Sequence, residues 1–188
     1  MVKRKIRVGF DFDGVLFYNP ARVIRPFIYF FKRHVLGIKK TKFYVPKNGF
    51  SQTIAALLHK SSLMPNKGFD DFLRLVNHPD YEVYIITARL SFLKNDLDKL
   101  LKKFDVTNIK KIIQNIGDEQ PHTFKERLIK ELKLDYYVED NWDIVKHLTE
   151  KTNATVIWIH NLVDLLFIKH PHHGGNLREA IDIIKKKL

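Results

Sequence analysis

The sequence predicts an α/β protein built on a parallel sheet of about five strands that is flanked by helices. Short runs of β-forming residues alternate with helical patterns along the chain, and this alternation is typical of a parallel sheet covered by helices. Polar residues directly follow several of the runs, as expected where strands end at a ligand-binding edge. At 188 residues the chain is long enough for one domain with its own core and a small insertion.

Apolar and β-branched runs mark the predicted strands, at residues 6–11, 82–87, 109–114, 135–139 and 155–160. The third of these runs is the weakest. Helical patterns lie between them at residues 66–79, 91–104, 123–132 and 141–150, and a last one covers residues 176–188. In that last pattern Leu177, Ile181 and Ile184 lie on one face, which predicts that the helix packs against the sheet.

The connection between the first two predicted strands is too long for one crossover. Asn19 followed by Pro20 is typical of a helix start, because it places a capping side chain before a proline at the first helical position. Ser51 marks the start of a second short helix. We therefore expect a small helical cap inserted after the first strand, with residues 16–65 forming the cap and residues 1–15 and 66–188 forming the core.

The net charge of +12 is concentrated towards the amino terminus. Residues 1–50 contain twelve Lys or Arg but only two acidic residues, Asp11 and Asp13, which gives this quarter a net charge of +10. Such a concentration favours an anionic partner, namely a phosphate ester, a nucleic acid or an acidic membrane surface. The simpler alternative is a lysine-rich surface that only keeps the protein in solution.

Several classes of protein are disfavoured by the composition. The chain has no cysteine, which excludes disulfides, thiolate metal sites and a thiol nucleophile. No apolar run approaches the ~20 residues that span a bilayer. The first residues lead into a strand without the apolar core of a signal peptide, so we expect a cytoplasmic protein.

Charged and hydroxyl side chains gather at the carboxyl ends of the predicted strands, which lie along one edge of a parallel sheet. Asp11 and Asp13 follow the first strand, and Thr87 and Arg89 follow the second. The strand at residues 135–139 ends in further carboxylates, and the helix before it carries an ammonium group; these residues are Glu139, Asp140, Asp143 and Lys125. We expect all of these side chains to meet in one site.

This mixture of groups suits phosphoryl transfer. Carboxylates held close together favour Mg²⁺, which takes a few carboxylates, waters and a substrate phosphate as ligands. A hydroxyl and an ammonium group opposite the metal stabilise the charge on the transferring phosphoryl group. One carboxylate can attack phosphorus, and a second can protonate the leaving oxygen and later activate water.

The pattern resembles that of the haloacid dehalogenase (HAD) superfamily of phosphatases over most of the chain outside the predicted cap. The stretch GFDFDGVLF is similar to its first motif, a hydrophobic strand followed by Asp-x-Asp-Gly. The resemblance implies a Rossmann-like sheet, Mg²⁺ as cofactor, and Asp11 as nucleophile and metal ligand. It implies that Asp13 is the general acid/base, with its backbone carbonyl on the metal. It also implies that Thr87 and Lys125 bind the phosphoryl group and that Asp140 is a metal ligand.

The fourth motif and the lysine leave alternatives open. The motif reads Glu139–Asp140, with Asp143 one position nearer than the common spacing. Glu139 and Asp143 are therefore both candidates for a further metal ligand, and Asp143 equally suits the first turn of a helix. Lys130 is an alternative to Lys125 for the third motif. The stretch of chain between Lys130 and the end of the acidic strand is too short, so we favour Lys125.

Two further features have competing interpretations. Arg89 suits either a substrate phosphate or an ion pair with the acidic edge of the sheet. Residues 170–175, HPHHGG, contain three histidines in a loop with no carboxylate at helical spacing, which favours a glycine loop near the site over a zinc site.

These observations predict a Mg²⁺-dependent phosphomonoester hydrolase that acts through an aspartyl-phosphate intermediate on a nucleotide or a similar small phosphate ester. The helical insert, the TAR stretch and the acidic pair look similar to 5′-nucleotidase-like phosphatases of the deoxyribonucleotidase branch. Polynucleotide 3′-phosphatases share several of these traits, so dephosphorylation of nucleic-acid ends is a second hypothesis.

A third hypothesis is a nucleic-acid-binding protein on a HAD scaffold. The predicted cap interleaves aromatic and basic residues, which suits stacking on bases as well as ordinary helix packing. Salt dependence would separate the hypotheses, because nucleic-acid binding weakens steeply with salt.

Overall fold

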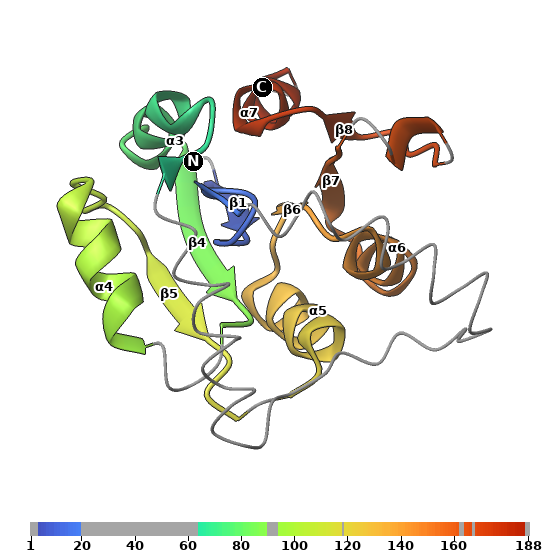
Figure 1. Cartoon of the computed structure of the whole chain (residues 1–188), viewed down its shortest axis with the longest axis horizontal. Coiled ribbons are helices and arrows are strands. Elements are labelled where there is room, and N and C mark those ends of the chain that lie inside the picture. Colours follow the sequence, from blue (N-terminus) through green and yellow to red (C-terminus); the bar gives the residue numbers. More distant parts are fainter. Residues whose placement is uncertain are drawn as a thin grey trace.

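A six-stranded parallel sheet forms the centre of the computed structural model (Figure 1), with the strand order β5-β4-β1-β6-β7-β8. The structure describes residues 4–19, 64–89, 94–117, 119–161, 164–166 and 168–186. The two helices expected in the cap fall within residues 20–63 and so lie outside the described residues.

The strands confirm the predicted parallel α/β sheet. Their bounds are Ile6–Phe10 (β1), Tyr81–Thr87 (β4), Lys111–Gln114 (β5), Tyr136–Glu139 (β6), Thr155–Ile159 (β7) and His173–Gly174 (β8). The sheet has six strands where about five are predicted, because the short strand β8 pairs with β7 at the edge of the sheet. This strand is only two residues long and contains no apolar run, so no sequence pattern marks it.

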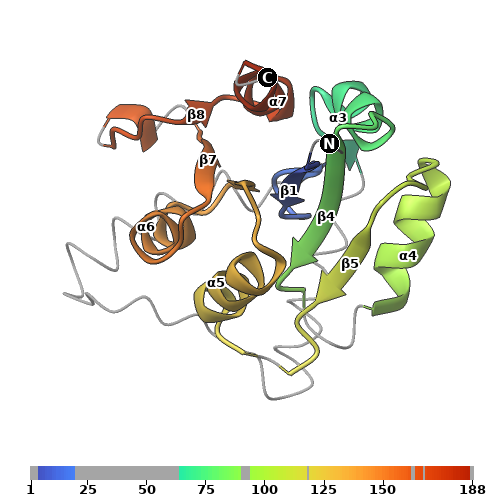
Figure 2. The same cartoon turned by 180° about the vertical axis from the view of Figure 1, so that it is seen from behind.

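Helices cover both faces of the sheet (Figures 1 and 2). The first face carries Phe69–Val76 (α3), Lys94–Lys103 (α4) and Leu177–Lys185 (α7), and the second carries Pro121–Leu132 (α5) and Trp142–Lys151 (α6). A short 3₁₀ helix spans Asp164–Leu166. Within the described ranges, no helix has the length and apolarity that crossing a bilayer requires.

Strand alternation divides the apolar side chains between two cores. In β1, Val8 and Phe10 are fully buried against α3 and α7. Gly9 faces the second core, where a Cβ atom would lie 2.6 Å from the Leu134 side chain and 2.7 Å from that of Tyr137. A side chain at Gly9 would therefore displace Tyr137 from its place across β1.

The helices on the second face lie close to their predicted ranges. α5 begins two residues before the predicted 123–132, and α6 begins one residue after the start of the predicted 141–150. Pro121 lies at the first turn of α5, where a missing N–H costs nothing, and Lys133 ends the helix in the left-handed conformation. Asn141 caps α6 by accepting a hydrogen bond from the Asp143 N–H at 3.0 Å. These caps fix where the two helices start relative to the strand ends.

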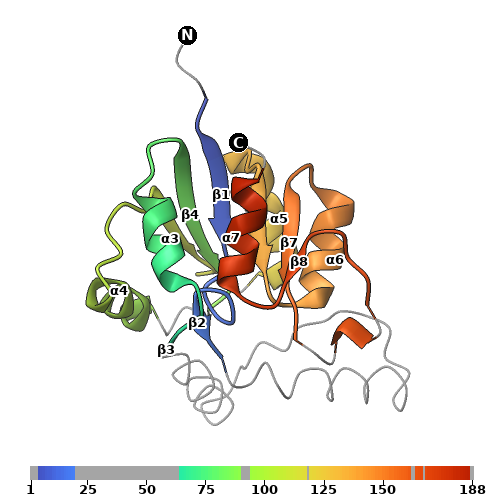
Figure 3. The same cartoon turned by 90° about the horizontal axis from the view of Figure 1, so that it is seen from above.

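A second, antiparallel sheet of two short strands, Phe17–Tyr18 (β2) and Met64–Pro65 (β3), lies beyond the carboxyl ends of the main strands (Figure 3). It pairs the chain just before residues 20–63 with the chain just after them. Leu16 and Phe17 are fully buried in the first core. The division into a core of residues 1–15 and 66–188 and a cap of residues 16–65 remains a prediction.

Candidate active site

The turn after β1 brings the chain back on itself at the carboxyl edge of the sheet. The Asp11 N–H donates to the Val138 carbonyl at 3.0 Å, which continues the pairing of β1 with β6. Gly14 has a φ of 84°, and a Cβ atom there would lie 2.2 Å from an Asp140 carboxylate oxygen. Only glycine combines this conformation with so close an approach. The turn therefore holds the backbone beside Asp13 directly against Asp140.

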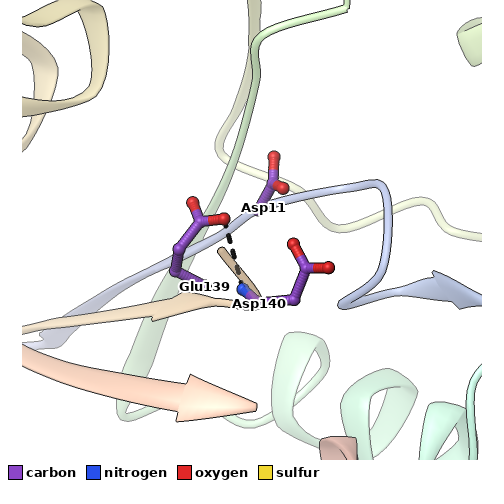
Figure 4. Close-up of side chains that lie close together, drawn as sticks. All are labelled: Asp11, Glu139 and Asp140. Carbon is purple, nitrogen blue, oxygen red and sulfur yellow. Dashed lines mark hydrogen bonds between the residues drawn. The ribbon is translucent and has the colours of Figure 1, made fainter. Parts of the chain in front are cut away.

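Three buried carboxylates converge at this turn (Figure 4). Asp11, Glu139 and Asp140 each offer an oxygen, and these oxygens all lie within 4.8 Å of one another. Glu139 is fully buried, and its Oε1 accepts hydrogen bonds from the N–H groups of Asp140 at 3.2 Å and Asn141 at 3.0 Å. One oxygen of Glu139 thus holds the turn between β6 and α6.

Lys125 joins two of these carboxylates. It projects from α5, and its Nζ lies 2.6 Å from Oε2 of Glu139 and 3.0 Å from Oδ1 of Asp11. Its side chain is only 2% exposed. Lys130, the competing lysine, lies one and a half turns further along α5, is 54% exposed and pairs with Glu126. The structure therefore brings Lys125, and not Lys130, to the carboxyl edge.

Burial affects the pKa values of Asp11, Glu139 and Lys125, which meet here. It raises the pKa of Asp11 to about 6, with Lys125 opposing the rise and Asp140 and Asp13 adding to it. Burial also raises the pKa of Glu139, again against the pull of Lys125. For Lys125 itself, burial disfavours the ammonium, but Asp11 and Glu139 outweigh it and raise its pKa. The site therefore holds a charged lysine beneath carboxylates that are costly to ionise together.

Asp13 and Arg89 form a second ion pair at the same edge. The guanidinium donates from Nε to Oδ2 and from Nη2 to Oδ1 of Asp13, both at 2.8 Å, and it lies 4.5 Å from the centre of the Phe12 ring. The side chains of Asp13 and Arg89 are 8% and 3% exposed. Of the two interpretations of Arg89, the structure contains the ion pair with the acidic edge.

Thr87 ends β4 beside Arg89 and is almost fully buried. Its hydroxyl oxygen accepts the Arg89 N–H at 3.2 Å, and its carbonyl accepts the Asn115 N–H at 3.1 Å. Asp143 lies in the first turn of α6. It does not join the carboxylate group of Asp11, Glu139 and Asp140, which is the one metal-compatible group within the described ranges.

The histidine loop extends the sheet. His170 contacts the Val156 carbonyl through Nε2 at 2.9 Å, and His173 lies in β8 with its Nδ1 3.4 Å from that of His160. Among described residues these histidines belong to no group of three metal-compatible ligands. The role of this loop remains a prediction.

Two supporting residues escaped the sequence interpretation. The Asn66 side chain donates to the carbonyls of Gly14 and Val15, each at 3.1 Å, and so closes the turn after Asp13 from across the insertion. Tyr137 lies beneath Lys125, with its ring centre 5.9 Å from Nζ, and its hydroxyl donates to the Ile86 carbonyl at 3.2 Å. Neither contact has a local sequence signal, because each joins segments about 50 residues apart.

The donor set fits a hard divalent cation. In the described part of this edge four carboxyl groups are buried, Asp11, Asp13, Glu139 and Asp140, against two buried cations, Arg89 and Lys125. With every group ionised, the formal charge of this set is −2, which a divalent ion would balance. Oxygen ligands alone suit Mg²⁺ rather than a softer metal. Asp11 and Asp140 are the best placed to bind it, because Glu139 is engaged with Lys125 and the backbone.

Comparison with known proteins identifies the fold. No protein-family model and no curated protein matches the chain, but solved structures do. A HAD hydrolase of family IA, variant 3, from Entamoeba histolytica is 17% identical, with a TM-score of 0.59 and coverage of 96% of this chain and 99% of that one. YfnB from Bacillus subtilis, solved bound to magnesium, is 12% identical, with a TM-score of 0.58 and coverage of 97% and 100%.

A third similar structure comes from an RNA repair complex, Pnkp1/Rnl/Hen1. It is 12% identical with a TM-score of 0.56, and the match covers 85% of this chain but 44% of that chain. The chain therefore has the fold of the HAD-superfamily hydrolases, which confirms the resemblance at the level of the superfamily fold. The finer resemblance to the deoxyribonucleotidase branch remains a prediction.

Proposed function

We propose that the protein is a Mg²⁺-dependent phosphomonoester hydrolase that forms an aspartyl phosphate on Asp11. The observation that carries the proposal is the buried group of Asp11, Glu139 and Asp140, bridged by Lys125. Burying charges at this density is unfavourable for folding alone. The cost is understandable where a cation and a phosphate ester bind.

The metal would be held by Asp11, Asp140 and the backbone carbonyl of Asp13. When bound, Mg²⁺ supplies positive charge that stabilises the oxygens of the transferring phosphoryl group. The magnesium-bound structure of YfnB, which shares the fold, supports this choice of metal.

The aspartates then divide the chemistry. In the first step a carboxylate oxygen of Asp11 forms a bond to phosphorus while the ester P–O bond breaks. Asp13, protonated once it has left Arg89, gives its proton to the leaving oxygen. In the second step Asp13 takes a proton from water, and the resulting hydroxide forms the new P–O bond as the bond to Asp11 breaks. Inorganic phosphate leaves, and both aspartates return to their starting states.

Lys125 and Thr87 complete the proposed site. The Lys125 ammonium lies 3.0 Å from Asp11, so it can reach a phosphoryl oxygen attached there and neutralise the charge that develops. The Thr87 hydroxyl lies at the end of the neighbouring strand β4, where it can donate to another of these oxygens. Glu139 keeps Lys125 in place through its bond of 2.6 Å.

The substrate that we favour is a nucleotide or a similar small phosphate ester, with 5′-nucleotidase-like specificity. Dephosphorylation of nucleic-acid ends is the second candidate. It is supported by the net charge of +10 in residues 1–50 and by the structural likeness to the Pnkp1 complex of RNA repair.

Phosphate release in the presence of Mg²⁺ tests the proposal, with nucleoside monophosphates, sugar phosphates and a 3′-phosphorylated oligonucleotide as substrates. The Asp11→Asn variant should lose turnover by at least about a thousandfold while it keeps the fold, because it removes the nucleophile. Asp80→Asn is the matched control, since Asp80 is 49% exposed before β4 at the opposite edge of the sheet. Full activity in Asp11→Asn would overturn the assignment.

A further inference from the structure

Asp13 is fully engaged by Arg89. Both carboxylate oxygens accept a bond of 2.8 Å from the guanidinium, and both side chains are nine-tenths buried or more. Bidentate charge-assisted bonds of this kind are among the strongest polar contacts in proteins. In this arrangement both carboxylate oxygens of Asp13 are bonded to Arg89.

The two buried cations of the edge serve different aspartates. Lys125 approaches Asp11 from α5, on one face of the sheet, whereas Arg89 follows β4 and contacts Asp13. Under the proposed function Asp11 takes the phosphoryl group and Asp13 contacts the leaving oxygen. Lys125 therefore flanks the phosphoryl group, and Arg89 flanks the alcohol that leaves.

The backbone of Arg89 is held by bonds that do not involve its guanidinium. The Arg89 carbonyl accepts a bond from the Gln114 side chain at 3.2 Å, and its N–H donates to Thr87 at 3.2 Å. The guanidinium is backed by the flat face of Phe12. A planar fork held in this way matches a phosphate as well as it matches a carboxylate.

We propose that Arg89 selects phosphomonoesters whose leaving alcohol carries a second phosphate group. This inference rests on the proposed function and names its substrate class. The second phosphate replaces the Asp13 carboxylate on the guanidinium, and Asp13 then turns to the leaving oxygen. The same chemistry is offered by a small nucleoside bisphosphate and by the phosphodiester next to a phosphorylated strand end. A substrate with one phosphate leaves Arg89 paired with Asp13.

Calorimetric binding to variants that cannot turn over tests the inference directly. In the Asp13→Asn background, with Mg²⁺, the probes are adenosine 3′-monophosphate, adenosine 5′-monophosphate, adenosine 3′,5′-bisphosphate and a 3′-phosphorylated dinucleotide. Removing the competing carboxylate should leave Arg89 to the second phosphate, so a compound with two phosphates should bind at least about tenfold tighter than one with a single phosphate.

Adding Arg89→Gln should remove that preference. The double variant loses both charges of the pair, so no buried charge is left without a partner and the fold should be retained. Arg74→Gln in the same background is the matched control, because Arg74 is 76% exposed on α3. An equal preference with and without Arg89, or no preference in Asp13→Asn, would show that Arg89 only supports the structure and would overturn the inference.

The same measurements distinguish the two phosphate sources, and they distinguish selection by Arg89 from the proposed function. Tighter binding of the bisphosphate than of the dinucleotide identifies a small substrate, and the reverse identifies a strand end; either ranking requires the dependence on Arg89. Wild-type phosphate release from monophosphates and bisphosphates at equal kcat/KM would overturn only the selection by Arg89. No release from any of the compounds would overturn the proposed function itself.

Discussion

Replacing Lys125 by methionine tests how the carboxylate group is held together. Methionine keeps the length and the apolar stem of the side chain but removes the ammonium between Asp11 and Glu139, which lie 3.0 and 2.6 Å from Nζ. Removing one member of a buried ion pair typically costs about 3–5 kcal/mol, because its partners remain as buried charges. We expect a loss of that size in the free energy of unfolding without Mg²⁺.

The loss should depend on pH in a defined direction. Burial already raises the pKa of Asp11 and Glu139, and without Lys125 both values rise further. Protonation of Asp11 and Glu139 removes the repulsion between their carboxylates, so Lys125→Met should lose less stability at pH 6 than at pH 8. Adding Glu139→Gln should restore part of the loss, since glutamine keeps an oxygen for the N–H groups of Asp140 and Asn141.

Chemical denaturation followed by circular dichroism measures these differences. Lys130→Met is the matched control on the same helix, and its exposed pair with Glu126 predicts a loss below about 1 kcal/mol. A loss for Lys125→Met no larger than that for Lys130→Met would contradict the role of Lys125 between the buried carboxylates. So would a further loss of stability when Glu139→Gln is added to Lys125→Met.

Two other predictions concern the metal. Gly14→Ala should lower stability by about 1–2 kcal/mol, because alanine is strained at a φ of 84°, and should weaken Mg²⁺ binding at least about tenfold, because its Cβ displaces Asp140. Titration calorimetry at constant pH checks this, and an unchanged affinity would contradict the placement of Asp140 at the metal. Burial raises the pKa of Asp11 from 3.8 to about 6 in the folded state. Without metal, the contribution of Asp11 to the free energy of unfolding should therefore be fully present below about pH 4 and be lost as the pH rises through 6. Mg²⁺ binds the ionised carboxylate, so the increase in Tm that Mg²⁺ causes should become larger from pH 5 to pH 7. An increase that becomes smaller over this range would contradict Asp11 as a metal ligand.

The sequence predicts the sheet well because each central strand is marked by a local run of apolar residues. The apolar runs at β1, β4 and β7 end in polar residues, and parallel pairing alone places those residues at one edge. β8 has no such pattern, since its two residues pair through backbone groups that any sequence offers. Its existence depends on where the loop after β7 is placed.

The side chains of the site are predictable as a set but not as pairs. The strand ends indicate which charged residues meet, yet the choice of Asp13 as the partner of Arg89 depends on side-chain directions after the turn at Gly14. The contact of Asn66 with that turn spans about 50 residues. Such contacts between distant segments arise only once the whole sheet has formed.

The phosphoryl group on Asp11 is the central element of the proposed function, and it can be detected directly. Wild-type protein is mixed with Mg²⁺ and the best substrate of the release assay, quenched in acid within one turnover, digested and analysed by mass spectrometry. We expect a phosphorylated peptide that contains Asp11, and none in the Asp11→Asn variant. Phosphate release by the wild type with no phosphorylated peptide, or with the phosphoryl group on another residue, would contradict the proposed function.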